Sequence, residues 1–199
     1  YMYRVAFSQR FSSATETKLS ADLKVMNKIK NAEAFNFEEL VPLTLPRKKE
    51  ELAELIKNIN FSTSNRFCIG ILDIMVNKFP KKFSNNGNVI LDNSYLMRAN
   101  SANYHHFFPK AYLATKGIQN ENSIVNIVLI DNYLNQNEIR AKAPSEYIKD
   151  FTKENNKLAE TLKSHLIDDI NEFGISDDNY EQFITKRSLK IAEEIISKI

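Results

Sequence analysis

The chain has 199 residues, of which 43% are apolar and 26% are charged, a balance that fits one folded domain and excludes a disordered or fibrous protein. A single cysteine, Cys68, excludes an internal disulfide, and the four scattered glycines form no phosphate-binding loop, so we expect no nucleotide cofactor. No apolar run reaches the roughly 18 residues that a membrane-spanning helix needs, and the first residues lack the pattern of an export signal, which favours a cytoplasmic protein that does not associate with a membrane.

The net charge of +2 is unevenly distributed along the chain. Residues 151–199 hold 7 Lys and Arg against 10 Asp and Glu, so the positive excess lies in residues 1–150. That excess allows an anionic partner without requiring one. The chain starts with Tyr1, and residues 1–11 already resemble part of a helix or strand, so we expect it to be the C-terminal piece of a longer protein.

Apolar residues at helical spacing predict three core helices in the first 80 residues. Their expected ranges are 14–30, 46–59 and 68–79. A capping-box spacing from Ser13 to Glu16 marks the start of the first helix, Pro46 can occupy the first turn of the second, and Pro80 ends the third.

The pattern changes after Pro80, where residues 80–103 resemble a loop with at most a short strand near 89–91. The expected elements beyond it are strands at 104–108 and 124–130, a short helix at 132–139, and helices beyond Pro144, including 158–166 and 180–199. This order predicts a single, mainly α protein with a small α+β insert. We expect a helical scaffold at 1–100, the insert at 101–142 and C-terminal helices at 143–199.

Polar residues in the insert stand out against their apolar neighbours. His105 and His106 are adjacent at the end of a predicted strand, and adjacent imidazoles are uncommon. Asn126 interrupts the apolar run 123–131, where an unpaired buried amide would cost about 1–3 kcal/mol, so we expect it to brace a loop. Asn135 follows on the predicted short helix, which could turn its carboxamide back towards the histidines.

These residues resemble the HNH, or His-Me finger, nucleases, whose ββα-metal unit holds one divalent ion over a scissile phosphate. The closer resemblance is to the C-terminal nuclease region of GmrSD-type modification-dependent restriction endonucleases. Residues 105–110, His-His-Phe-Phe-Pro-Lys, are similar to that family's His-His-Ile-Phe-Pro-Lys. Residues 122–126 are similar to its Asn-Ser-Ile-x-Asn, and residues 142–147 to its Lys-x-Pro-Ser-x-Tyr. The resemblance covers about 1–150 and is strong at 104–147.

The resemblance implies a role for each polar residue of the insert. His105 and Asn135 would be metal ligands, with Asn137 as an alternative to Asn135, and His106 would be the general base that activates water. Asn126 would brace the loop and hold the His106 backbone. The ion would be Mg²⁺, while the imidazole ligand leaves Mn²⁺, Ni²⁺ and Zn²⁺ open. Because side chains alternate faces along a strand, His105 and His106 can serve one site only if the strand ends or bulges there.

The resemblance also implies DNA, possibly modified, as the substrate of a restriction or phage-defence enzyme, with an NTP-using recognition domain N-terminal to this chain. Several basic residues could contact backbone phosphates. They are Lys110, Lys116, Arg140 and Lys142 around the site, and Lys81, Lys82 and Arg98 in the preceding loop. Two alternatives stay open: a catalytically silent helical interaction module, and an RNA-directed toxin nuclease with the same site. His165, beside apolar helix positions, is predicted to be structural.

Overall fold

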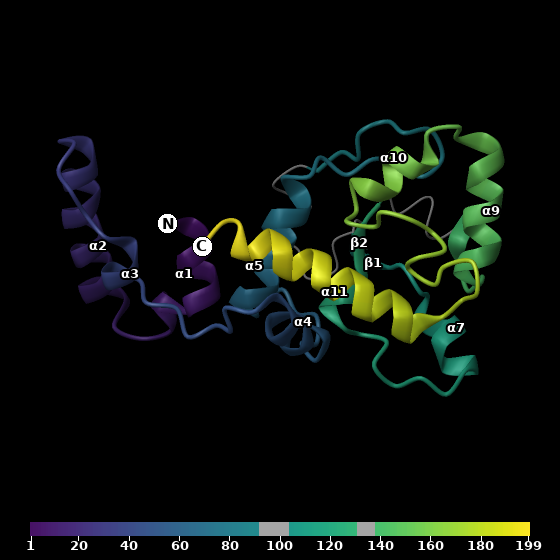
Figure 1. The fold of residues 1–199 in the computed structure, drawn as a ribbon, viewed down its shortest axis with the longest axis horizontal. Coiled ribbons are helices and arrows are strands. Elements are labelled where there is room, and N and C mark those ends of the chain that lie inside the picture. Colours follow the sequence, from purple (N-terminus) through teal and green to yellow (C-terminus); the bar gives the residue numbers. More distant parts are fainter. Residues whose placement is uncertain (92–103, 131–137) are drawn as a thin grey trace.

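The computed structural model describes residues 1–91, 104–130 and 138–199, and it confirms a mainly helical protein with a small antiparallel sheet (Figure 1). Its N-terminal part contains α1 (Met2–Ser8), η1 (Arg10–Ser12), α2 (Thr15–Lys30), α3 (Phe37–Leu40), α4 (Lys49–Lys57) and α5 (Arg66–Val76). The middle contains β1 (Tyr104–His106), α7 (Lys110–Thr115), η2 (Ile124–Asn126) and β2 (Ile127–Leu129), and the C-terminal part contains α9 (Pro144–Glu154), α10 (Leu158–Lys163) and α11 (Tyr180–Ile196). None of the helices in these described ranges combines the length and apolar character needed to cross a bilayer.

Helix α11 is the central element of the core, where it packs against α4 and α5 and reaches the sheet region (Figure 1). Its apolar residues recur every three or four positions, so they line one face of the helix, and that face is fully buried. Leu52 and Ile56 of α4 and Ile71 of α5 are fully buried on the opposing faces. Of the three predicted core helices, those at 46–59 and 68–79 are confirmed as α4 and α5, and the start of the chain is structured as predicted, in α1.

The predicted helix ends extended too far. Helix α4 begins at Lys49, beyond Pro46, and α5 ends at Val76. After α5 the chain turns at Phe79, which has a positive φ of 51° and a side chain 73% exposed. Helix α10 ends at Lys163 and α11 at Ile196, so both are shorter than the apolar repeats suggested. Apolar spacing does not fix where a helix ends, because the apolar residue in the following turn is buried in one case, Leu166, and exposed in another, Phe79.

The prediction that α2 is a core helix is wrong. Leu19 and Leu23 are 47% and 57% exposed, and Figure 1 shows α2 and α3 standing apart from the other helices. The one buried residue of α2 is Asp22, which accepts hydrogen bonds from Arg10 and from the Tyr1 hydroxyl. An ion pair thus fixes this helix where apolar packing was expected. The predicted capping box is also absent, because Ala14 is the N-cap and no side chain caps the helix.

Substitution of Leu23 by serine is therefore expected to change the free energy of unfolding by less than about 0.5 kcal/mol, as at other exposed positions. Ile56→Ala is the matched comparison, because Ile56 is fully buried and its truncation should cost about 2–5 kcal/mol. Urea unfolding followed by circular dichroism measures both values. A loss in Leu23→Ser comparable to that in Ile56→Ala would contradict the exposed position of α2.

The sheet is an antiparallel pair in which His105 is opposite Val128 and His106 is opposite Ile127. Both strands are shorter than predicted. The first ends at His106, and residues 124–126 form a 3₁₀ turn in which the Ser123 hydroxyl accepts a hydrogen bond from the backbone N–H of Val125. No strand forms at 89–91; the backbone N–H of Val89 donates to the Pro80 carbonyl at 3.0 Å, beside an isolated antiparallel bridge between Lys81 and Asn88. The predicted helix at 132–139 lies, up to residue 137, outside the described residues.

Aromatic side chains hold the sheet region against the C-terminal helices. The ring of Phe107 stacks on that of Phe183 in α11, with centroids 4.8 Å apart, and Phe108 packs on the same ring at 5.0 Å. The hydroxyl of Tyr147 in α9 donates to the Phe107 carbonyl at 2.6 Å. A two-stranded ribbon is marginal by itself in water, so these contacts carry the stability of the segment that follows His106.

Candidate active site at the end of strand β1

His106 is the half-buried last residue of β1, and its Nε2 lies 3.1 Å from the side-chain oxygen of Asn122. Burial lowers the pKa of His106 to about 4, and the positive charge of Lys110 acts in the same direction, while the Asn122 hydrogen bond and the Glu121 carboxylate oppose the shift. The ring is therefore neutral at pH 7, the protonation state that a general base requires.

His105 lies on the other face of the strand and is only 6% exposed. A site shared by His105 and His106 requires the strand to end or bulge there, and β1 does end at His106. Within the strand, however, the two rings point in opposite directions. Among the described residues, no group of three His, Cys, Asp or Glu side chains is placed to hold a metal ion. Asn135 and its alternative Asn137 lie outside the described residues, so His105 is the described member of the predicted ligand pair.

Asn126 is fully buried and braces the loop that follows β1. Its side-chain oxygen accepts from the backbone N–H of Phe108 at 2.8 Å, and its amide nitrogen donates to the carbonyls of Phe108 and Glu121, each at 2.9 Å. The prediction that the Asn126 side chain holds the His106 backbone is wrong, because its bonds go to the backbone of Phe108 and Glu121. His106 pairs with Ile127 in the sheet, so the Asn126 side chain reaches the next turn of chain, at Phe108.

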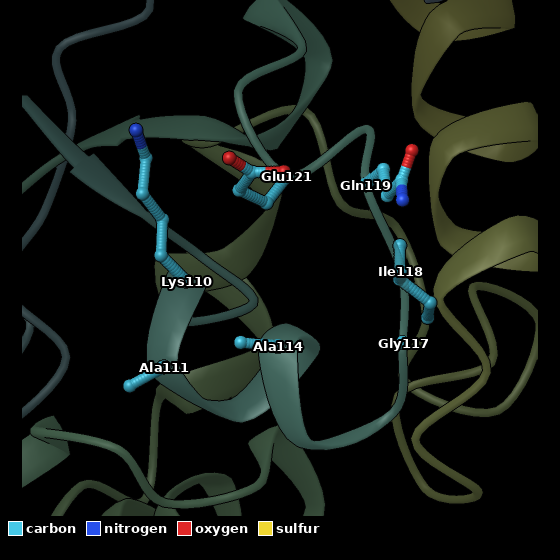
Figure 2. Close-up of a pocket in the computed structure, with 7 residues that line it drawn as sticks. All are labelled: Lys110, Ala111, Ala114, Gly117, Ile118, Gln119 and Glu121. Carbon is cyan, nitrogen blue, oxygen red and sulfur yellow. The ribbon is translucent and has the colours of Figure 1, made fainter.

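A cleft of about 650 Å³ lies between α7 and the loop that leads to η2. Figure 2 shows Lys110 and Glu121 extending towards its rim, with Gln119 on the other side and Ala111 and Ala114 on the wall formed by α7. His106 does not line this cleft; the Asn122 side chain that bonds its imidazole follows Glu121 of the lining in the chain. The cleft thus combines a cation and a carboxylate, Lys110 and Glu121.

The other predicted phosphate contacts are dispersed. Lys116 lies over the ring of Tyr112, 5.5 Å from its centroid, and Lys142 pairs with Asp150 at 3.3 Å in a separate cavity that Glu138 also lines. Lys81 donates to the side chain of Asn88, Lys82 is half-buried, Arg140 is exposed, and Arg98 lies outside the described residues. Of the predicted basic residues that the structure describes, Lys110 alone lines this cleft.

Two residues that shape the site had no predicted role: Asn122, the first residue of the matched segment 122–126, and Arg187. Arg187 of α11 is fully buried and donates to the backbone carbonyls of Val125, Ile127 and His165, the last two at 2.7 and 3.1 Å. These bonds flank Asn126 and fix the start of β2. A signal was present, because Arg187 stands on the apolar face of the last predicted helix, where a charge must find buried partners.

His165 follows α10 and has the structural role predicted for it. It is fully buried, and its Nε2 donates to the carbonyl of Lys81 at 2.8 Å, since a carbonyl can only accept. Its ring packs edge-on against Phe83 at 5.0 Å. Burial lowers the pKa of His165 to about 4, with the nearby Arg187 charge contributing.

We therefore expect stability to fall as the pH drops from about 6.5 to about 4. Between these pH values His165 is protonated in the unfolded chain and neutral in the folded protein. The contribution of His165 to the free energy of unfolding is therefore complete above the unfolded pKa and is lost as the pH falls towards the folded pKa. The loss should approach about 3 kcal/mol for this residue. Urea unfolding across the window should show a smaller slope in His165→Gln, which keeps a donor for Lys81. Equal slopes in the two proteins would contradict the assignment.

Comparisons with known proteins give one relative without a known activity. No protein-family profile matches the chain. The chain is 28% identical over 221 aligned positions to an uncharacterised protein of Methanocaldococcus jannaschii, an alignment that covers 97% of this chain and 35% of the relative. The chain therefore spans about a third of the length of the curated relative it matches. No solved structure matches it.

Proposed function

We propose that the chain is a metal-dependent endonuclease that hydrolyses phosphodiester bonds in DNA, with His106 as the general base. The observation that carries the proposal is the position of His106. It is a half-buried imidazole at the end of a strand, held by the amide of Asn122 and followed by a loop that a second amide braces. Asn122 follows Glu121, which lines a polar cleft. The resemblance of residues 104–147 to the GmrSD-type nuclease region points to the same residue.

Each described residue of the site has a task in this proposal. His106 takes the proton of the attacking water, and Asn126 keeps the loop after His106 in place through its three hydrogen bonds. Lys110, exposed at the start of α7, offers a positive charge to the phosphate. The site needs no nucleotide, in keeping with the absence of a glycine-rich loop in the sequence.

The proposal includes a divalent cation, which rests on the resemblance and on the ligand types of two residues. His105 and Asn135 would hold the ion, an imidazole and an amide oxygen being accepted ligands of Mg²⁺, Mn²⁺, Ni²⁺ and Zn²⁺ to different degrees. Bound there, it would act as a Lewis acid that stabilises the negative charge growing on the phosphate. The carboxylate of Glu121 in the same cleft would repel a phosphate, and a cation would offset that repulsion.

The wider protein is part of the proposal. We place this nuclease in a cytoplasmic restriction or phage-defence enzyme that acts on modified DNA, in which a separate NTP-using domain recognises the target. Two features support this placement. The basic residues of this chain are dispersed, and its sequence predicts no helix lined with base-reading side chains, so target recognition is assigned to another domain. The longer relative leaves room for such a domain in a protein of this kind.

Cleavage of supercoiled plasmid, modified and unmodified, tests the proposal. Purified protein is incubated with Mg²⁺, Mn²⁺ or excess EDTA, beside the His106→Ala variant prepared in the same way, and a single-stranded RNA is assayed in parallel. We expect nicking or linearisation of DNA that needs the metal and is lost in the variant. Cleavage that survives EDTA or the variant would contradict the proposal, and cleavage confined to RNA would support the RNA-directed alternative.

The burial of His105 favours one further candidate, a catalytically silent interaction module. In that case the β1–β2 pair has a structural role only and His105 is a core residue. The two functions differ in metal binding, which isothermal titration with Mn²⁺ measures. Binding that His105→Ala abolishes supports the nuclease, and absence of binding in the folded wild-type protein supports the silent module.

A further inference from the structure

The hydrogen bond between His106 and Asn122 has a defined direction. An asparagine side chain carries an acceptor oxygen and a donor nitrogen, so its orientation follows from its neighbours. The nitrogen of Asn122 lies 3.2 Å from the backbone carbonyl of Phe61, which can only accept. With the amide reversed, two oxygens would face each other there. The Asn122 oxygen is therefore the atom that faces His106, and Nε2 of the imidazole must carry the hydrogen.

The backbone around Asn122 is anchored from outside the loop. The chain after α4 runs antiparallel to it, with the N–H of Phe61 donating to the Asn122 carbonyl at 2.8 Å and the N–H of Ile124 donating to Ile59 at 2.9 Å. The Ser123 hydroxyl donates to the carbonyl of Lys57 at 3.0 Å. Reorienting the Asn122 amide would break its bonds on both sides, so the orientation is built into the fold.

We infer that Asn122 is a positioning residue that holds the proton of His106 on Nε2 and so leaves Nδ1 as the basic nitrogen of the site. The tautomer follows from the hydrogen bonds alone, while its catalytic meaning rests on the proposed function. In that function Nδ1 receives the proton of the attacking water, and Nε2 keeps its own proton throughout. Either nitrogen of an isolated neutral imidazole can carry the proton, and Asn122 removes that ambiguity.

Nuclear magnetic resonance of the whole chain with ¹⁵N-labelled histidine tests the inference without requiring activity. The chain has three histidines, so the spectrum is simple, and His106→Gln assigns the signals of His106. At neutral pH we expect a slowly exchanging Nε2–H proton on His106 and an unprotonated Nδ1. A wild-type spectrum with the proton on Nδ1, or with both nitrogens protonated, overturns the inference, and this result depends on no variant of Asn122.

Asn122→Ala should remove the Nε2–H signal of His106, because its proton then exchanges with water. Asn120→Ala is the matched control, since Asn120 lies in the same loop and bonds the same Lys57 carbonyl as Ser123, at 3.4 Å, so it should keep the signal. If the wild-type protein cleaves DNA, Asn122→Ala should lower kcat about 10-fold to 100-fold and leave KM within about twofold. Persistence of the signal in Asn122→Ala overturns the inference.

The two proposals fail separately. Protein with the predicted Nε2–H proton that cleaves no nucleic acid contradicts the nuclease and keeps the tautomer. Protein that cleaves DNA through His106 with its proton on Nδ1 contradicts the role of Asn122 and keeps the nuclease.

Discussion

His106→Ala is expected to slow metal-dependent DNA cleavage by about 10²-fold to 10⁴-fold, the usual contribution of a positioned general base. The variant loses the nitrogen that accepts the proton of water, while Asn126 still braces the following loop through bonds that do not involve the imidazole. DNA affinity should change little, because the charge of Lys110 remains. Rates on a fluorescent duplex and affinities from anisotropy separate the two effects.

Thr115→Ala serves as the control for this experiment. Thr115 is exposed at the end of α7, and its hydroxyl bonds only within its own turn, to the carbonyl of Tyr112 at 2.7 Å. It should cleave DNA at the wild-type rate. Thermal unfolding of both variants checks that they are folded. A His106→Ala rate within threefold of wild type would remove His106 from the role of base.

Arg187→Met is expected to destabilise the protein by about 3–5 kcal/mol, an effect as large as that of truncating a core side chain. The methionine keeps much of the length and the apolar contacts of the arginine. It cannot donate to the buried carbonyls of Val125, Ile127 and His165, each of which loses a charged donor. Although burial lowers the pKa of Arg187 to about 9, the guanidinium stays charged at neutral pH.

The neighbouring Lys186→Met is the matched control. Lys186 is on the same helix but partly exposed, and its ion pair with Glu172 at 2.9 Å is worth about 1 kcal/mol or less. Urea unfolding of the two variants should therefore give clearly different midpoints. If Arg187→Met unfolded at the same urea concentration as Lys186→Met, the bonds to the β2 backbone would carry no net stability.

The helices were predictable where one face is buried along its whole length. In α5 and α11 the apolar residues repeat at helical spacing, and the structure packs those faces together. The same spacing misled at α2, because the face that looked apolar has Asp22 at its buried position and its leucines in solvent. The spacing of apolar residues predicts that a helix is amphipathic. It does not predict which element packs on the apolar face, because that depends on the whole fold.

The site was predictable in its local residues and not in its long-range ones. His106 and Asn126 stand out because a polar residue interrupts an apolar strand. Asn122 acts through Phe61 and Arg187 through Ile127, contacts that join segments 61 and 60 positions apart in the chain. Asn122 lies in the matched segment 122–126 and Arg187 on the apolar face of the last predicted helix, but no local pattern names their partners, so the sequence could not show that these residues orient the site.

The aromatic and arginine contacts of the hairpin also determine how far the candidate site is a separable unit. Residues 104–130 form a contiguous stretch of sequence, yet Phe107 and Phe108 are packed on Phe183, and Arg187 holds the backbone of β2. Transplanted to another scaffold, this stretch would carry its histidines and Asn126 without the helix that keeps them ordered. A functional transplant of the site therefore requires residues 104–130, which contain β1 and β2, together with helix α11.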